Sequence, residues 1–98
     1  MKRLTATEIA DGLALLPGWQ RSDNGDEGIE YWYRGADFAD AMTFVKEVAA
    51  VAEAAGHHPD LDIRYNRVRV FLTTHDEGGV TDRDLAVARA ILHAVEGG

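Results

Sequence analysis

Hydrophobic residues recur at helical spacing in three segments of this chain, and they alternate with polar residues in the segments between. The first helical segment follows Thr5, and Glu8 stands three residues later, which is the spacing of a capping box. The second runs from Phe38 to Ala55 behind Asp37, a residue type that caps helices. The third begins after Thr81. These segments predict three amphipathic helices.

Four shorter segments have the composition or the alternation of β-strands. Trp19 begins the first, an aromatic-rich run from Ile29 to Phe38 forms the second, and Asn24-Gly25 between them is a strong turn signal. The fourth covers Val68–Thr74. In the third strand, a half-buried face is predicted by the alternating residues Leu61, Ile63 and Tyr65.

The predicted order is therefore helix, two strands, helix, two strands, helix. Short connections favour antiparallel pairing, and the apolar stripes of the helices must be buried against one face of the sheet. Residues 1–98 predict a single α+β domain of two layers, a four-stranded antiparallel sheet with three helices packed on one face. The order of the strands within the sheet is not deducible from these patterns.

Charge and composition narrow the partners of such a domain. A net charge of -7 argues against an electrostatic grip on nucleic acid or anionic lipid, and the absence of cysteine excludes disulfides and thiolate metal sites. Arg64, Arg67 and Arg69 are locally dense, but their alternate spacing is typical of a solvated strand face. No apolar run approaches the roughly 20 residues that span a bilayer, and the N-terminus lacks the apolar stretch of a secretory signal. We expect a cytoplasmic domain whose limited core favours self-association.

Candidate chemistry concentrates in three of the four histidines. His57 and His58 lie between the end of the second helix and Pro59, and His75 follows the fourth strand. Imidazole, with an unperturbed pKa of about 6.5, suits proton transfer near neutral pH. Glu53 lies four residues before His57, so we expect both side chains on one face of the helix end, with the carboxylate holding the ring. Alone, His57 would also serve as a cap for the last helical carbonyls.

Two further interpretations of these residues must be weighed. Histidine clusters often bind zinc. Here adjacent histidines point apart and no cysteine completes a ligand set, so no metal site is predicted. Asp84 stands three residues after Thr81, where it would complete a second capping box with Asp in place of the usual Glu or Gln. On spacing alone, capping is the better interpretation of Asp84 than catalysis.

Taken together, these residues resemble the pterin-4a-carbinolamine dehydratases, also called 4a-hydroxytetrahydrobiopterin dehydratases. The resemblance rests on Glu53-Ala-Ala-Gly-His57-His58-Pro59, on Tyr65 six residues later, on His75 ten beyond that, and on Asp84 nine further on. The segment Leu16-Pro17-Gly18-Trp19 also resembles the N-terminal part of the family, so the similarity spans nearly the whole chain. The fold that it implies is an antiparallel four-stranded sheet with helices on one side.

The resemblance implies a hydro-lyase that removes water from a 4a-hydroxytetrahydropterin to give the quinonoid dihydropterin. The pterin is then the substrate, and no cofactor is required. His57 and His75 are expected to act as acid and base, with Glu53 polarising the first, and which of the two is the acid stays open. His58 is expected to bind the pterin and assist. The implied substrate contacts are the three histidines and Thr74, with Glu53 and Asp84 in support.

Two positions depart from the family pattern. Gly56 stands where mammalian members carry an acidic residue. Leu61 stands where many members carry a tryptophan close to the pterin, and the loss of that aromatic ring weakens stacking on a flat heterocycle. Mammalian relatives also act as dimerisation cofactors for a homeodomain transcription factor. The alternative function is therefore a non-catalytic protein-binding module that uses the broad apolar face of the 38–55 helix. The family also implies a homo-oligomer, dimer or tetramer, and a pterin of folate or molybdenum-cofactor metabolism stays open as the substrate.

Overall fold

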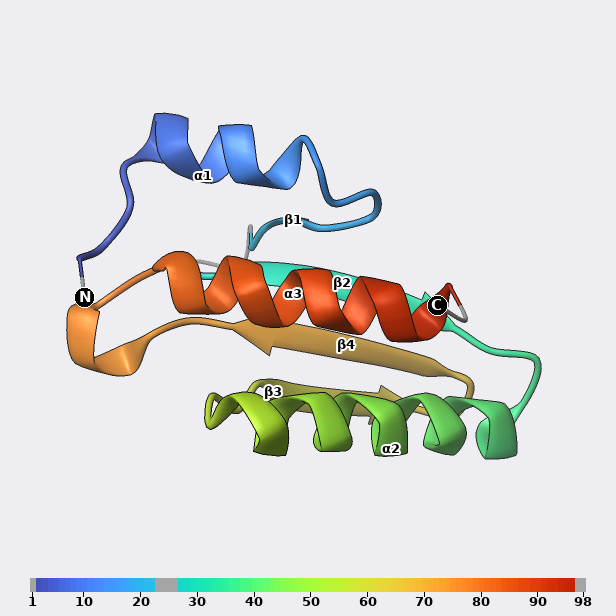
Figure 1. Ribbon diagram of the computed structural model, residues 1–98. Helices are drawn as coiled ribbons and strands as arrows, with labels where there is room; N and C mark the ends of the chain where they lie inside the picture. Colours follow the sequence, from blue (N-terminus) through green and yellow to red (C-terminus); the bar gives the residue numbers. More distant parts are fainter. Residues whose placement is uncertain (1, 23–26, 97–98) are drawn as a thin grey trace.

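The fold is described from a computed structural model over residues 2–22 and 27–96. Four strands form one antiparallel sheet in the order β1-β2-β4-β3 (Figure 1). The strands are β1 (Gln20–Arg21), β2 (Ile29–Arg34), β3 (Asp60–Arg64) and β4 (Arg67–Leu72). The helices are α1 (Ala6–Leu13), α2 (Phe38–Ala55) and α3 (Asp82–Val95), and a short 3-10 helix, η1 (His75–Glu77), precedes α3. The predicted two-layer α+β fold is confirmed, whereas the Asn24-Gly25 turn lies outside the described residues.

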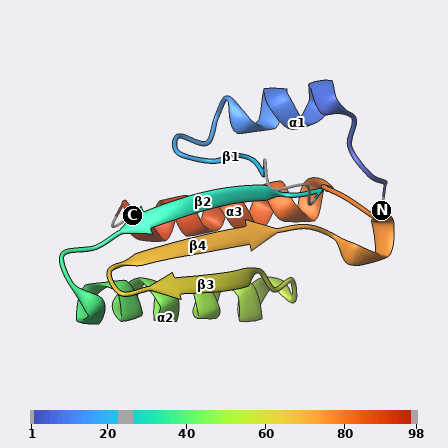
Figure 2. The ribbon, with the colours of Figure 1, turned by 180° about the vertical axis from the view of Figure 1, so that it is seen from behind.

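The helices cover one face of the sheet and leave the other face open. Helices α2 and α3 run side by side in front of the strands in Figure 1, and the view from behind in Figure 2 shows the uncovered face. Helix α1 packs closely on α3, because a Cβ atom at Gly12 would lie 2.6 Å from Leu85 Cδ1. The alternation predicted for the fourth strand is also confirmed, since its inward residues Val68, Val70 and Leu72 are fully buried.

Capping residues begin the three helices where the sequence predicts, and Gly56 ends α2. In α2, the Asp37 side chain accepts the backbone N–H of Asp40 at 2.9 Å. The helix ends at Ala55 because Gly56 adopts the left-handed conformation, with φ of 64°, in which its backbone N–H bonds back to the last turn. The first capping box is complete, with Thr5 and Glu8 exchanging both hydrogen bonds.

Two predicted strand ends are wrong. The second strand stops at Arg34 rather than Phe38, because Asp37 turns the chain into α2 and Phe38 is already helical. The fourth stops at Leu72 rather than Thr74. The backbone of Thr74 pairs instead with Gly79 across the loop that contains η1, so the chain leaves the sheet before reaching His75.

Burial at the sheet edge and on its open face also differs from expectation. Leu61 and Ile63 point inward from β3 but remain 36% and 40% exposed, because β3 is an edge strand. Arg69 is not part of a solvated row: its guanidinium lies 2.7 Å from the buried Glu30 and 4.9 Å from the centre of the Phe71 ring. Arg64 and Arg67 are exposed as predicted.

The two tryptophans lie in contrasting surroundings. Trp19 is buried and stacks on Tyr31 with ring centroids 5.4 Å apart. Trp32 lies on the open face of the sheet beside Arg67. Over residues 2–22 and 27–96, none of the helices has the length and apolar content needed to cross a membrane.

Candidate active site

The three predicted histidines meet at one cavity of about 320 Å³. His57 and His58 enter it from the turn after α2, and His75 enters from the start of η1. The segment that follows β4 and the first turn of α3 form other parts of its wall. Its other lining residues are Gly56, Thr73, Thr74, Asp76 and Arg83.

His57 and Asp84 form a buried pair. Nε2 of His57 lies 2.5 Å from Oδ1 of Asp84, and their side chains are 10% and 0% exposed. The other carboxylate oxygen of Asp84 accepts two hydrogen bonds at 2.8 Å, from the Thr81 backbone N–H and from the Thr74 hydroxyl. Asp84 therefore caps α3, as its spacing predicts, and holds His57 at the same time, while a part in catalysis stays a prediction.

His58 and Glu53 form an exposed pair. Nε2 of His58 lies 2.6 Å from Oε1 of Glu53, and their side chains are 60% and 78% exposed. The prediction that Glu53 holds His57 is therefore wrong. It assumed that helical spacing continues past residue 55, whereas left-handed Gly56 reverses the chain and turns His57 inward toward α3.

Arg83 fixes the turn that presents both histidines. Its guanidinium donates to the Gly56 carbonyl at 2.8 Å, and this peptide group leads directly into His57. Because the contact joins the start of α3 to the end of α2, it holds the two ends of the cavity together. The sequence analysis missed Arg83, and its only signal was its position beside Asp84.

Thr74 lies in the cavity wall but its hydroxyl is already used by the protein. It is 2.8 Å from the Thr81 hydroxyl and 2.8 Å from Asp84 Oδ2, and the residue is only 7% exposed. Thr74 thus ties the end of β4 to the first turn of α3. A direct contact between Thr74 and a substrate stays a prediction.

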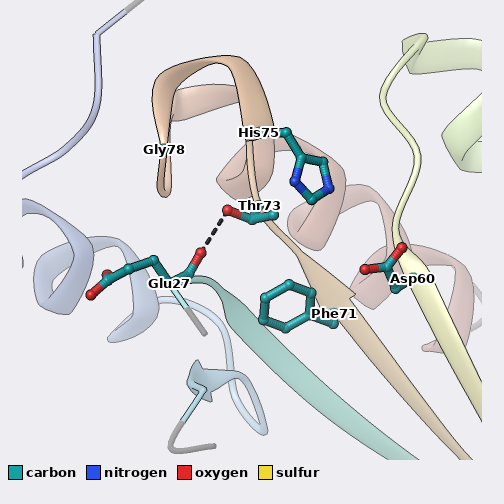
Figure 3. A pocket seen from close by; sticks show the side chains of 6 residues that line it. All are labelled: Glu27, Asp60, Phe71, Thr73, His75 and Gly78. Carbon is teal, nitrogen blue, oxygen red and sulfur yellow. Dashed lines mark hydrogen bonds between the residues drawn. The ribbon is translucent and has the colours of Figure 1, made fainter. Parts of the chain in front are cut away.

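His75 stands between two cavities. It shares the first with the other histidines and, together with Thr73, also lines a second cavity of about 320 Å³ shown in Figure 3. The second cavity is on the side of the sheet where Phe71 projects, and Phe71, Thr73 and His75 all line it. Its remaining lining residues, which the sequence analysis missed, are Glu27, Asp60 and Gly78.

This arrangement is suited to proton transfer. Two imidazoles are each held through one ring nitrogen by a carboxylate, which leaves the other nitrogen for a ligand, and His75 has no carboxylate bonded to it among the described residues. Among the described residues, no three His, Asp or Glu side chains lie close enough together to hold a metal ion.

Comparison with known proteins finds relatives that match nearly the whole chain. The profile of the family described as pterin 4 alpha carbinolamine dehydratase matches residues 2–94. A relative from Chloroflexus aggregans, provisionally named pterin-4-alpha-carbinolamine dehydratase, is 54% identical over 93% of this chain and 95% of its own. A second, from Gloeobacter violaceus and provisionally named pterin-4-alpha-carbinolamine dehydratase 2, is 49% identical over 93% of this chain and 100% of its own.

A solved structure extends the agreement to three dimensions. The crystal structure of a transcriptional coactivator/pterin dehydratase from Brucella melitensis matches with a TM-score of 0.85 at 42% identity, over 92% of this chain and 95% of that one. The fold and the family match together define a small lyase. The chain belongs to the pterin-4a-carbinolamine dehydratase family, whose members are hydro-lyases.

Proposed function

We propose that this protein dehydrates a 4a-hydroxytetrahydropterin to the quinonoid dihydropterin by proton transfer through histidines. The observation that carries the proposal is the convergence of His57, His58 and His75 on one cavity, with buried Asp84 bonded to the first of them. Positioned imidazoles typically supply about 10²- to 10⁴-fold of rate acceleration by general acid–base catalysis.

The reaction needs two protons to move and no electrons to be exchanged. The bond between carbon 4a and the hydroxyl oxygen breaks, and that oxygen leaves as water after it is protonated. A proton also leaves a ring nitrogen, and the electron pair of that N–H bond completes the new C=N bond. Because the balance closes with two proton-transfer groups, we propose that no metal or organic cofactor takes part. Dialysis against a chelator is expected to leave the rate unchanged.

The surroundings of the histidines support a division of roles among them. Asp84 holds Nε2 of His57, which leaves Nδ1 to take the ring-nitrogen proton, and the buried carboxylate stabilises the imidazolium that forms. Among the described residues, no carboxylate is bonded to His75. The imidazolium of His75 is therefore free to donate its proton to the leaving oxygen. His58 is held by exposed Glu53 and would position the pterin.

The test is to generate 4a-hydroxytetrahydropterin in situ and follow its dehydration by absorbance. Wild-type protein is expected to accelerate the reaction, and His57→Ala is expected to lose at least roughly 100-fold in kcat. His93→Ala is the matched control, because His93 is the fourth histidine and is exposed in the last turn of α3. Absence of acceleration by folded wild-type protein would contradict the proposal.

A second candidate function, binding of a protein partner, has one observation in its favour. A cavity of about 410 Å³ lies between α2 and α3, and the relative from Brucella melitensis is described as a coactivator as well as a dehydratase. We propose that this groove also supports self-association. Light scattering is expected to show an oligomer for wild-type protein and a smaller species for Ala54→Glu. The apolar lining of the groove consists of Val51, Ala54, Ala55, Ala86, Val87 and Ala90.

A further inference from the structure

One end of the uncovered sheet face carries a row of arginines. Arg34 ends β2, Arg64 ends β3 and Arg67 begins β4, and the register places Arg67 directly opposite both of the others. Residues that are directly opposite project from the same face with Cβ atoms about 5 Å apart, so the row crosses three strands. In Figure 2 this end of the sheet lies at the β3–β4 connection, whereas η1 and the histidines lie beyond the other end of β4.

The row concentrates positive charge in an acidic chain, which has 17 aspartates and glutamates against 10 lysines and arginines. Arg64 is bonded to Asp62 at 3.0 Å, but Arg34 and Arg67 form no ion pair within residues 2–22 and 27–96. Like charges directly opposite each other on neighbouring strands destabilise a sheet. The isolated fold therefore gains nothing from this row, whereas a bound anion would neutralise it.

Two exposed aromatic side chains lie at the same end of the sheet. Trp32 precedes Arg34 by two residues on the same face, is 43% exposed, and has the Arg67 guanidinium 6.0 Å from its ring centroid. Tyr65 is 66% exposed in the turn between β3 and β4, where its φ of 56° is one that bulky side chains rarely adopt. Tryptophan, tyrosine and arginine are the residue types that dominate binding energy at protein interfaces. Their combination here indicates an interaction surface.

The shape and charge of this surface select the kind of partner. None of the cavities described above is lined by Trp32, Arg34 or Arg67, whereas small molecules bind in concave sites. A guanidinium donates two parallel hydrogen bonds to a carboxylate, which an extended acidic segment can present. A nucleic acid would bring phosphates beyond the row, and these would meet the remaining surface of a chain with a net charge of -7. A short acidic segment meets the row alone.

We propose that this surface, made of the arginine row with Trp32 and Tyr65, binds an extended acidic segment of a partner protein. Carboxylates of the segment pair with Arg34 and Arg67, and an apolar side chain between those carboxylates packs on Trp32. The groove between α2 and α3 lies on the other side of the sheet, so the two surfaces are separate. The inference does not depend on the proposed reaction, because the row and the histidines lie at opposite ends of β4.

The experiment uses a short fluorescein-labelled peptide of glutamates around a single phenylalanine, and the same peptide with glutamine in place of glutamate. Fluorescence anisotropy is expected to show binding of the acidic peptide alone, with an affinity that falls as salt is added. Arg34→Gln should weaken binding by roughly three- to fivefold, and Arg34→Gln with Arg67→Gln by roughly ten- to 25-fold. Neither variant should melt below wild type, because each relieves repulsion between like charges.

Arg89→Gln is the matched control, since it removes one exposed arginine from α3 on the covered side of the sheet. It should leave the affinity unchanged, and Arg34→Gln should leave the dehydration rate unchanged. Absence of binding to the acidic peptide at low salt, or equal weakening by Arg89→Gln and Arg34→Gln, would overturn the inference. Tighter binding of a short oligothymidylate would overturn it in favour of nucleic acid. A smaller species for Arg34→Gln in light scattering would overturn it in favour of a second copy of this chain.

Discussion

Two histidine–carboxylate pairs of almost equal length use the two histidines that directly follow left-handed Gly56. The buried pair, His57–Asp84, joins Nε2 to Oδ1 over 2.5 Å, and the exposed pair, His58–Glu53, joins Nε2 to Oε1 over 2.6 Å. Their surroundings differ completely, because Asp84 is inaccessible to solvent while the Glu53 side chain is 78% exposed. Water and salt screen the exposed pair. If the buried pair loses one member, no solvent can take the place of the lost partner beside the remaining charge.

The buried pair is also built into the fold, and the exposed pair is not. Asp84 accepts hydrogen bonds from the first turn of α3 and from the end of β4 as well as from His57. Within the described residues, the Glu53 side chain is hydrogen-bonded to His58 alone. The distance within each pair therefore does not decide its importance for stability. What differs is the number of chain segments that each carboxylate joins by hydrogen bonds.

Asp84→Asn is expected to have the largest effect. The amide keeps the shape of the carboxylate but places an NH₂ group against N–H or O–H donors, which disturbs both the orientation of His57 and the capping box. We expect a loss of roughly 100- to 10,000-fold in kcat and about 1–3 kcal/mol in the free energy of unfolding. Dehydration kinetics and urea denaturation measure the two. Activity within tenfold of wild type in a folded protein would show that the buried pair is purely structural.

Thr74→Val tests the support of the buried pair without changing the pair itself. Valine has nearly the shape of threonine, but Asp84 Oδ2 loses one donor and the Thr81 hydroxyl loses one of its partners, keeping the Arg83 backbone N–H. The expected cost is about 1–2 kcal/mol in the free energy of unfolding, with a loss of activity smaller than that of Asp84→Asn. If activity falls as far as in Asp84→Asn, the Thr74 hydroxyl itself takes part in the reaction.

Glu53→Gln is the corresponding change in the exposed pair. Solvent already surrounds both side chains, so the free energy of unfolding should change by less than about 0.5 kcal/mol. Activity is expected to fall by less than roughly tenfold, with most of the change in KM, because His58 is proposed to position the substrate. A fall in kcat equal to that of Asp84→Asn would remove the contrast between the pairs.

Glu8→Gln extends the contrast to the two capping boxes, and its effect should be the smallest. Glu8 occupies the same position in α1 that Asp84 occupies in α3, but it is fully exposed. The hydrogen bond from the Thr5 backbone N–H, and then that from the Thr5 side chain, lower the pKa of Glu8 below its ordinary value. Its contribution to stability is therefore present above that ordinary value, 4.5, and is lost as the pH falls through the lowered folded pKa.

The measurement is the melting temperature as a function of pH, from neutral to about pH 3. Glu8→Gln should show a slightly lower melting temperature near neutral pH and a shallower decline in acid. Lys2→Gln is a suitable control, because Lys2 has the weakest influence on the pKa of Glu8. Identical acid profiles for wild type and Glu8→Gln would mean that the first capping box adds no measurable stability.

Local signals predicted the helices of this fold well. Asp37 and Gly56 bracket α2 at the predicted residues because capping depends on side chains and backbone conformations within a few residues. Burial in β3 could not be predicted in the same way. Leu61 and Ile63 alternate like residues of a half-buried strand, but their exposure depends on the position of β3 at the sheet edge, which depends on contacts distant in sequence.

The sequence predicted which histidines meet at the candidate site but not which carboxylate is bonded to which histidine. His57, His58 and His75 meet at one cavity as the sequence analysis expected, whereas the partner of His57 is Asp84 rather than Glu53. The error has a specific origin, since the i, i+4 rule holds only while the helix continues. Asp84 is 27 residues from His57 in sequence, and only the packing of α3 against α2 brings them together.

The contrasting tryptophans give the protein two separate optical signals. Trp19 is 5% exposed and stacked on Tyr31, so its fluorescence reports loss of core packing and is shielded from quenchers in solution. Trp32 is 43% exposed, with the Arg67 guanidinium 6.0 Å from its ring centroid, and that charge draws iodide toward the ring. Iodide quenching therefore reads the open face of the sheet, while the unquenched emission follows the interior.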